Sequence, residues 1–453
     1  MFSYSSYLGK TPTSKVISIL AILYFGSMYG SCFISPELFE TFMAESLNST
    51  NIGSYEATSN LSMLGSWWSG PKECPSTLVK NMLPEGYENQ PHTVTSDDGY
   101  ILTLFRILKS DEAEEQGGEA KPVVLVQHGL QNDGTTFLQN GEKSLVIQLV
   151  DAGFDVWLGN NRGSRFSRKH VKLSPESKEF WNFSFDEMGE QDLPAFFRYI
   201  IETTGQDKIR YIGHSQGTTQ MFAALSDPVT RPKIAPHVEV FYALAPVVYL
   251  NDNKLPIPNF AAYLTNIVRI VKNVLRVNYL ALGTCLWSQP EVEKINKQCS
   301  EHYKGCYKAY SWYDQEPSVL NWPRAGYLSM SSPSGSSTDC LLHYGQLVER
   351  QNSDQWYFAK YDYGNQAQNM KKYGQKTAPS YDLSLIQETV RMWVGSADGI
   401  VTPPEAMRIQ VRAFNADIGI KVLTDWGHSS FHLAVNSEFY YTELVEALKS
   451  GKY

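Results

Sequence analysis

The sequence predicts an α/β protein with a mostly parallel central sheet, helices on the faces of that sheet and a large helical insertion. Beyond residue 90, short apolar segments rich in β-branched residues alternate with segments of helical periodicity, as strands buried between two helical layers require. The alternation stops between about residues 251 and 380, which is too long for a loop and favours an inserted domain. With 42% hydrophobic and 19% charged residues, the chain of 453 residues can bury a large core.

The charge balance argues against nucleic acid as a partner. The sequence holds 39 Lys and Arg against 47 Asp and Glu, which leaves a net charge of -8. No basic stripe stands out that could neutralise a row of phosphates.

The N-terminal segment is typical of a protein that enters the secretory pathway. Lys10 and Lys15 precede an apolar run over residues 16–25, and the next charge is Glu37. Small residues near position 30 favour a cleaved signal peptide at residues 1–31, although a run of this length could instead remain as a membrane anchor. Either alternative places the rest of the chain on the lumenal side, for secretion or for lysosomes.

Three N-x-Ser/Thr sequons agree with a lumenal destination, since N-glycans are added there. They begin at Asn48, Asn60 and Asn182. The first two lie in a Ser/Thr/Asn-rich linker within the lead-in at residues 32–83, whereas aromatic residues flank Asn182 and leave it open to burial.

The core elements follow one another along the chain. A turn at residues 96–99 predicts a hairpin between His92–Thr95 and Tyr100–Ile107. Apolar runs then predict buried strands at Pro122–Gln127, Phe154–Leu158, Ile209–Ile212, Val238–Leu244, Thr389–Val394 and Gly419–Thr424. Helical periodicity predicts helices at Gln191–Ile201, Gln216–Leu225, Pro404–Phe414 and Ser437–Leu448.

Six cysteines suit an oxidising compartment but are too few for a disulfide scaffold. They stand at positions 32, 74, 285, 299, 306 and 340. Cys299 and Cys306 are the natural pair, whose bond would close a short loop. Metal ligation by this pair is disfavoured because no His or Cys partners stand at zinc spacing, and we expect neither a metal nor a cofactor.

One segment concentrates the residues of nucleophilic catalysis. Residues 213–217 read Gly-His-Ser-Gln-Gly, between the strand at Ile209–Ile212 and the helix at Gln216–Leu225. This context is that of a nucleophile elbow, in which a sharp turn lifts Ser215 clear of the sheet so that a base can activate it. The alternative for a bare G-x-S-x-G pattern is an ordinary glycine-rich turn.

An acid and a base should follow the serine in that order, each after a late strand. Asp398 follows the strand at Thr389–Val394, and His428 follows the strand at Gly419–Thr424. Backbone N–H groups of Leu130, after an early strand, and of Gln216 would hold the oxyanion. For the loop that carries Leu130, the alternative is an ordinary glycine-containing loop.

Other residues compete for the acid and base roles. Asp417 and Asp425 are the competing acids, at a helix exit and beside the histidine. His432 competes as the base, because four residues separate it from His428 and a helix would stack the two on one face. The remaining histidines are interpreted as structural, among them His92, His237, His302 and His343.

Five blocks of the sequence resemble the acid lipase family, the group of lysosomal acid lipase and gastric lipase. They are residues 127–130 (Gln-His-Gly-Leu), 155–163, 180–188, 192–195 and 213–217. The likeness runs from about residue 84 to the end of the chain. It implies an α/β-hydrolase fold and hydrolysis of neutral lipid esters, either triacylglycerols or sterol esters, without a metal or colipase.

Carried over residue by residue, the resemblance selects the same catalytic residues and oxyanion donors: Ser215, Asp398, His428, Leu130 and Gln216. The sequence departs from the family at Ser430, where an aspartate usually follows the catalytic histidine by two residues. Cys299 and Cys306 resemble the bridged pair of the family, in a loop of unusual size.

The expected organisation is a hydrolase core interrupted by a cap. The predicted divisions are a signal peptide or anchor at 1–31, a lead-in at 32–83, a core at 84–250 and 381–453, and a cap or lid at 251–380. Apolar residues at helical spacing in Phe260–Leu282 either pack inside this cap or face lipid.

The expected function is that of a lipase that meets lipid esters at an oil-water or membrane interface and needs no protein partner. Two alternatives stay open. One is a carboxylesterase or peptidase on the same fold that acts on soluble substrates. The other is a non-catalytic lipid-binding protein, which would need a broken triad.

Overall fold

The computed structural model describes residues 77–111, 120–250, 252, 268–269, 272, 278–280, 289–310, 314–350 and 356–453, and the structural statements below concern these residues. The predicted signal peptide or anchor and the sequons at Asn48 and Asn60 lie outside them. Most of the apolar stripe at Phe260–Leu282 also lies outside them.

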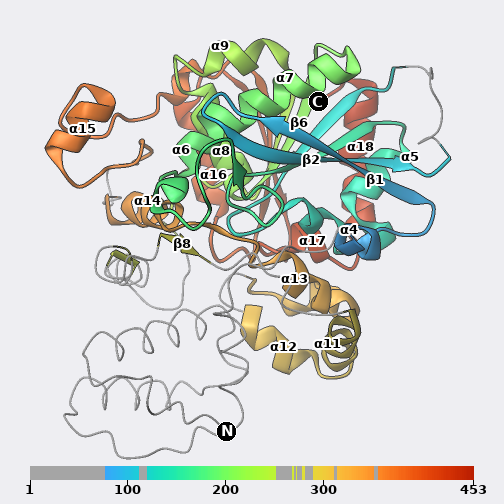
Figure 1. Cartoon of the computed structure of the whole chain (residues 1–453). Helices are drawn as coiled ribbons and strands as arrows, with labels where there is room; N and C mark the ends of the chain where they lie inside the picture. The colour runs from blue at the N-terminus through green and yellow to red at the C-terminus, as the bar shows by residue number, and fades with distance from the viewer. Residues whose placement is uncertain are drawn as a thin grey trace, which may run out of the picture.

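A nine-stranded sheet forms the centre of the molecule (Figure 1). Its order is β1-β2-β4-β3-β6-β7-β10-β11, and β5 pairs with β2. The six strands from β4 to β11 run parallel, whereas β1 and β2 join them antiparallel, which confirms the predicted α/β class. The strands are β1 Tyr87–Thr95, β2 Tyr100–Lys109, β3 Val123–Gln127, β4 Asp155–Asn160, β5 Lys169–His170, β6 Ile209–His214, β7 Val238–Leu244, β10 Thr389–Gly395 and β11 Asp417–Leu423.

Helices cover both faces of the sheet, because the strand residues that point to one face and those that point to the other are both apolar. In β3, Val123 and Leu125 join one buried cluster, with α7, α8 and α16, while Val124 and Val126 join the other, with α5 and α18. The core helices are α4 Thr77–Met82, α5 Leu145–Asp151, α6 Phe185–Glu187, α7 Leu193–Thr204, α8 Gln216–Leu225, α9 Arg231–Ile234, α16 Pro403–Arg412, α17 Ser430–Leu433 and α18 Ser437–Ser450.

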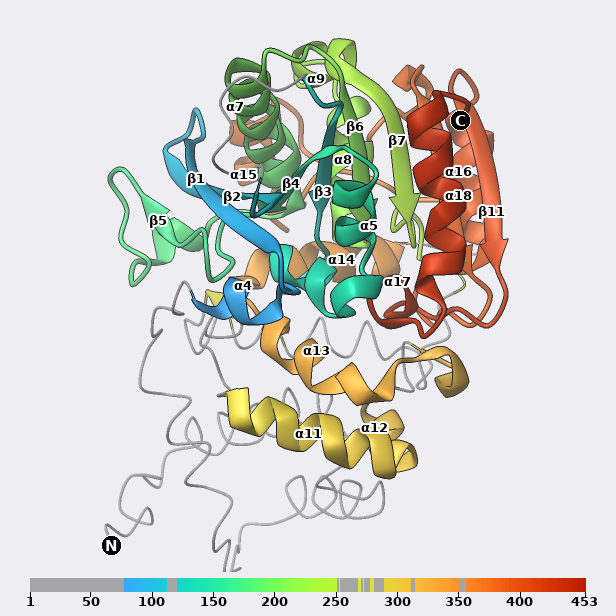
Figure 2. The same cartoon turned by 90° about the vertical axis from the view of Figure 1, so that its right-hand side faces the viewer.

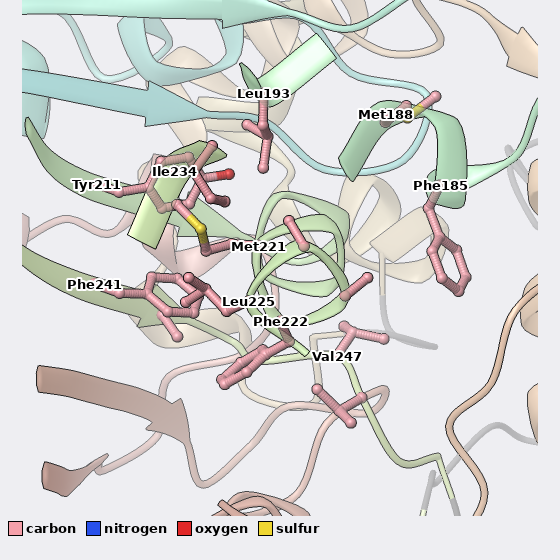
Figure 3. Close-up of a cluster of buried hydrophobic side chains, with 14 of the residues drawn as sticks. Phe185, Met188, Leu193, Tyr211, Met221, Phe222, Leu225, Ile234, Phe241 and Val247 are labelled. Atoms are coloured by element: carbon pink, nitrogen blue, oxygen red, sulfur yellow. The ribbon is translucent and has the colours of Figure 1, made fainter. Parts of the chain in front are cut away.

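Helix α8 is buried along its whole length, from Gln216 to Leu225. Figure 3 shows Met221 and Phe222 of this helix among Tyr211 of β6 and Phe241 of β7. A helix packed on every side cannot shift without disturbing the core. The residue that precedes it, Ser215, is therefore held in place by the core.

The segment between residues 251 and 380 adds helices outside the sheet. They are α11 Gln289–Glu301, α12 Tyr303–Tyr310, α13 Ala325–Ser331, α14 Thr338–Arg350 and α15 Gln366–Tyr373, with a small hairpin of β8 Tyr279–Leu280 and β9 Ser336–Ser337. In Figure 2, α11, α12 and α13 lie beyond the end of the sheet toward which β7 and β11 point. A disulfide joins Cys299 of α11 to Cys306 of α12. No helix of the described part has the length and apolar character needed to cross a membrane.

Two lysines tie the end of this segment to the core, and we call their ion pairs the return clasp. Lys360 lies 2.6 Å from Glu190 and 2.7 Å from Asp227, and all three side chains are largely buried. Lys372 of α15 lies 3.0 Å from Glu187 of α6. Buried ion pairs of this kind lose much free energy when one partner is removed.

Candidate active site

Ser215 stands on a sharp turn between β6 and α8. Its backbone has φ 54° and ψ -120°, a conformation that non-glycine residues rarely adopt. The turn is fixed from two sides, because the Ser215 N–H donates to the Leu244 carbonyl at 3.0 Å and Thr218 donates to the Ser215 carbonyl at 2.6 Å. The predicted strand, turn and helix are all present, and they present the serine at the carboxyl edge of the sheet.

Two glycines permit this turn. A methyl group at Gly217 would lie 2.3 Å from the Gln127 carbonyl oxygen, and one at Gly213 would lie 2.7 Å from the Gly217 carbonyl carbon. Both distances are far below contact distance, so no side chain fits at either position. The crowding is the physical reason for glycine on both sides of the serine.

The structure brings Ser215, His428 and Asp398 together in one chain of hydrogen bonds. His428 Nε2 lies 2.9 Å from Ser215 Oγ, and His428 Nδ1 lies 2.9 Å from Asp398 Oδ2. An imidazole held in this way carries its proton on Nδ1 and donates it in a hydrogen bond to the carboxylate, which leaves Nε2 free to accept the hydroxyl proton.

Asp398 is fully buried and its second oxygen is occupied. Oδ1 accepts the backbone N–H groups of Ile400 at 2.7 Å and Val401 at 3.0 Å, which fixes the carboxylate. Burial alone would lower the pKa of His428, but the charge and hydrogen bond of Asp398 raise it above its ordinary value.

The two predicted oxyanion donors flank the serine. Gln216 is the first residue of α8, and Leu130 follows Gly129, where a methyl group would lie 3.0 Å from Ser215 Cβ. Among the described residues, neither backbone N–H has a protein acceptor. Both therefore stay candidates for holding a ligand oxygen beside Ser215.

His432 is close to the site but is not directed at the serine. His428 precedes helix α17, so the two histidines do not share a helical face as the spacing had indicated. His432 Nε2 instead lies 2.9 Å from His214 Nδ1, and His214 Nε2 lies 3.0 Å from the His428 carbonyl. Burial lowers the pKa of His432 to about 3 and that of His214 as well, so both are neutral at ordinary pH.

The competing acids and the other histidines have other partners. Asp417 pairs with Arg391 at 2.8 Å, and Asp425 is exposed at a left-handed turn. His343 is buried between Ser184 and the Ala359 carbonyl, which agrees with a structural role.

One neighbour of the site was missed from the sequence. Asp314, in the segment between residues 251 and 380, is fully buried and accepts the backbone N–H of Ser429 through both carboxylate oxygens, at 3.0 and 3.1 Å. The only local signal is a run of polar and aromatic residues without periodicity, which does not indicate a partner.

The sequon at Asn182 and the cysteine at position 340 both lie in the described part. Asn182 is exposed, so the aromatic residues around it do not bury this sequon. Cys340 is a buried thiol, and burial raises its pKa to about 12, which makes it unreactive.

Similar proteins identify the family. Residues 80–141 match the partial alpha/beta-hydrolase lipase region, and residues 122–255 match the alpha/beta hydrolase fold. Gastric triacylglycerol lipase of Rattus norvegicus is 34% identical over 403 residues, which cover 87% of this chain and 93% of that protein. Lipase member K of Homo sapiens is 34% identical over 385 residues, which cover 83% and 87%. The chain belongs to the acid lipase family of α/β hydrolases.

Membership of the acid lipase family confirms the resemblance drawn from the five blocks and the predicted hydrolase fold. Among solved structures, a soluble variant of monoglyceride lipase from Saccharomyces cerevisiae has a TM-score of 0.48 and 14% identity, over 80% of this chain and 94% of that chain.

At the position where this member of the acid lipase family departs from the usual pattern, Ser430 Oγ accepts the Gly427 N–H at 2.9 Å.

Proposed function

We propose that this member of the acid lipase family hydrolyses neutral lipid carboxylic esters, triacylglycerols or sterol esters, through a Ser215, His428 and Asp398 triad. The observation that carries the proposal is the chain of two 2.9 Å hydrogen bonds from Asp398 through His428 to Ser215 Oγ. The names of its relatives, gastric triacylglycerol lipase among them, support the choice of a lipid ester.

The mechanism is acyl transfer in two halves. His428 takes the hydroxyl proton as Ser215 Oγ attacks the ester carbonyl, and the N–H groups of Leu130 and Gln216 hold the oxyanion. The alcohol leaves with the proton from His428, which gives an acyl-serine and the free alcohol. Water then attacks the acyl-serine with His428 again as the base, and the fatty acid is released with Ser215 restored.

The segment at residues 251–380 is proposed as the cap that meets the lipid. Its helices α11, α12 and α13 lie beyond the carboxyl end of the sheet, the same end at which Ser215 stands (Figure 2). A cap in this place would control access of an oil-water or membrane interface to the serine.

The proposed destination is the secretory pathway, either secretion or the lysosome. The apolar run after Lys10 and Lys15 supports entry, and the sequons at Asn48, Asn60 and Asn182 support glycosylation. Alkaline extraction of membranes from expressing cells separates a cleaved signal from an anchor, since only an anchored protein stays in the pellet.

A fluorophosphonate probe tests the nucleophile. We expect the probe to label the wild-type protein and to fail on Ser215→Ala, because the alanine has no oxygen to phosphonylate. Equal labelling of the two proteins would show that Ser215 is not the nucleophile.

Turnover of three substrates then tests the substrate class. We expect hydrolysis of triolein or cholesteryl oleate that increases once an emulsion forms, and Ser215→Ala is the matched inactive control. Preference for a short water-soluble ester, with no increase at the interface, would favour a soluble-ester hydrolase. Binding of lipid without any turnover would favour a lipid carrier.

A further inference from the structure

The loops that carry the acid and the base of the proposed triad are joined by a third segment. Asp314 forms an antiparallel bridge with Asp398, and the Gln315 N–H donates to the Ala397 carbonyl at 3.0 Å. The same stretch continues along the base loop, where Leu320 bridges Ala434. Residues 314–320 therefore lie against both the acid loop and the base loop.

Asp314 is the residue of this stretch that reaches the base. Its two carboxylate oxygens accept the N–H of Ser429, the residue directly after His428. The approach is close, because a methyl group at Gly427 would lie 2.0 Å from Asp314 Oδ1. Asp314 thus contacts the peptide on both sides of His428.

A purely structural role does not explain a carboxylate here. Asp314 is fully buried, and none of the described residues gives it a Lys or Arg partner. A buried carboxylate without a cation is costly, and an amide would accept the same N–H at lower cost. The titratable groups that face it are Asp398, His428 and the phenol of Tyr307, whose hydroxyl donates to the Gln315 carbonyl at 3.0 Å.

We propose that Asp314 is a positioning residue: it holds the peptide after His428 so that the imidazole stays between Asp398 and Ser215, and its charge favours the imidazolium that forms during the reaction. This inference rests on the proposed function of the triad. It assigns to the segment at residues 251–380 a direct part in the geometry of the base, beside any part in substrate access.

The charge of Asp314 also couples its titration to that of the base. Burial, together with the charge of Asp398, raises the pKa of Asp314 to about 7, against the hydrogen bond from Ser429 and the charge of His428, which lower it. The charge of Asp314 in turn raises the pKa of His428, whereas the neighbouring neutral His214 and His432 contribute no negative charge. The protonation of each group therefore depends on the charge of the other.

Two variants of the full-length protein separate position from charge. Asp314→Ala removes both the acceptor and the charge, so we expect kcat on p-nitrophenyl butyrate to fall roughly 10- to 100-fold with little change in KM. Asp314→Asn keeps one acceptor oxygen, so kcat should largely recover. The acid limb of kcat/KM in Asp314→Asn should move to lower pH, because the negative charge that Asp314 carries beside His428 above about pH 7 is gone.

The controls make each result decisive. Glu316→Gln, an exposed carboxyl on the same stretch that caps Ser318, should leave kcat, KM and the pH profile unchanged. Melting temperature and fluorophosphonate active-site titration correct for any unfolded fraction, and if Asp314→Ala does not fold, the pH profile of Asp314→Asn decides. A loss confined to KM, or an Asp314→Asn profile equal to that of Glu316→Gln, would overturn the inference. An inactive wild type, or a labelled Ser215→Ala variant, would overturn the proposed function instead.

Discussion

At the scale of single residues, strained backbone marks the carboxyl edge of the sheet. The four non-glycine residues with positive φ in the described part are Gln131, Ser215, Ala245 and Asp425. They follow the ends of β3, β6, β7 and β11, so all four lie where parallel strands end. Strain of this kind costs roughly 1–3 kcal/mol per residue and persists only where surrounding packing imposes it.

The hydrogen bond between His428 and Asp398 predicts how catalysis should depend on pH. His428 can accept a proton only when neutral, and its raised pKa means that kcat/KM falls as the pH drops through a value above the ordinary one. Asp398→Asn removes the charge that raises this pKa, so the acid limb should move to lower pH, and kcat should fall roughly 10⁴-fold.

Initial rates on a soluble ester across pH check this prediction. Asp382→Asn is the matched control, because Asp382 is an exposed acid that caps Ser384 away from the triad. An acid limb that stays in place in Asp398→Asn would mean that another group sets the pKa of the base.

The residues of the site were predictable where sequence order and chemistry agree. Ser215, Asp398 and His428 each follow a recognisable strand, and the chain order of the three is fixed by the fold. Asp314 was not predictable, because its partners Asp398 and Ser429 are far along the chain and its own surroundings have no period. The contact between His214 and His432 is hidden for the same reason.

At the scale of elements, helix α16 begins with a capping box that carries a buried acid. Glu405 accepts the N–H groups of Thr402 at 2.9 Å and Asp252 at 3.0 Å. Burial raises the pKa of Glu405 to about 7, against two backbone hydrogen bonds that lower it. The folded protein therefore binds this proton more tightly than the unfolded chain does.

The sign of the effect on stability follows from that difference. The contribution of protonated Glu405 to the free energy of unfolding is fully present below its unfolded pKa of 4.5, and it is lost as the pH rises through about 7. Glu405→Gln stays neutral throughout. As the pH rises between these values, the free energy of unfolding of the variant should therefore increase relative to that of the wild type, by up to about 3 kcal/mol.

Urea unfolding at several pH values measures this gain. Glu446→Gln, at an exposed carboxyl in α18, is the control and should show no such trend. A difference between wild type and Glu405→Gln that does not change with pH would contradict a raised pKa at this cap.

Most elements were predictable from period and composition, and the misses have physical reasons. Strand β1 begins at Tyr87 rather than at His92, so Pro91 lies within it. A proline is tolerated there because β1 is an edge strand, and an edge strand does not need the backbone N–H that proline lacks. Helix α5, Leu145–Asp151, was missed because it is short and nearly all apolar, so it shows no contrast between faces.

At the scale of the whole molecule, the return clasp links the end of the segment at residues 251–380 to the core. Lys360→Met would leave Glu190 and Asp227 largely buried without their cation. We expect a loss of about 3 kcal/mol in the free energy of unfolding, since removing one partner strands the other charges.

Guanidinium unfolding of two variants tests the clasp. Lys143→Met is the control, because Lys143 and Glu438 form an exposed pair and should contribute less than about 1 kcal/mol. Equal losses in both variants would indicate that Lys360 contributes no more than a surface charge.

The return clasp has a consequence for exchanging this segment between relatives. A donor segment grafted between residues 251 and 380 would bring its own residues to positions 360 and 372, while the recipient keeps Glu187, Glu190 and Asp227. Unless the donor supplies two cations there, the hybrid would enclose three unneutralised acids. Compatible donors can therefore be screened by two positions before any protein is made.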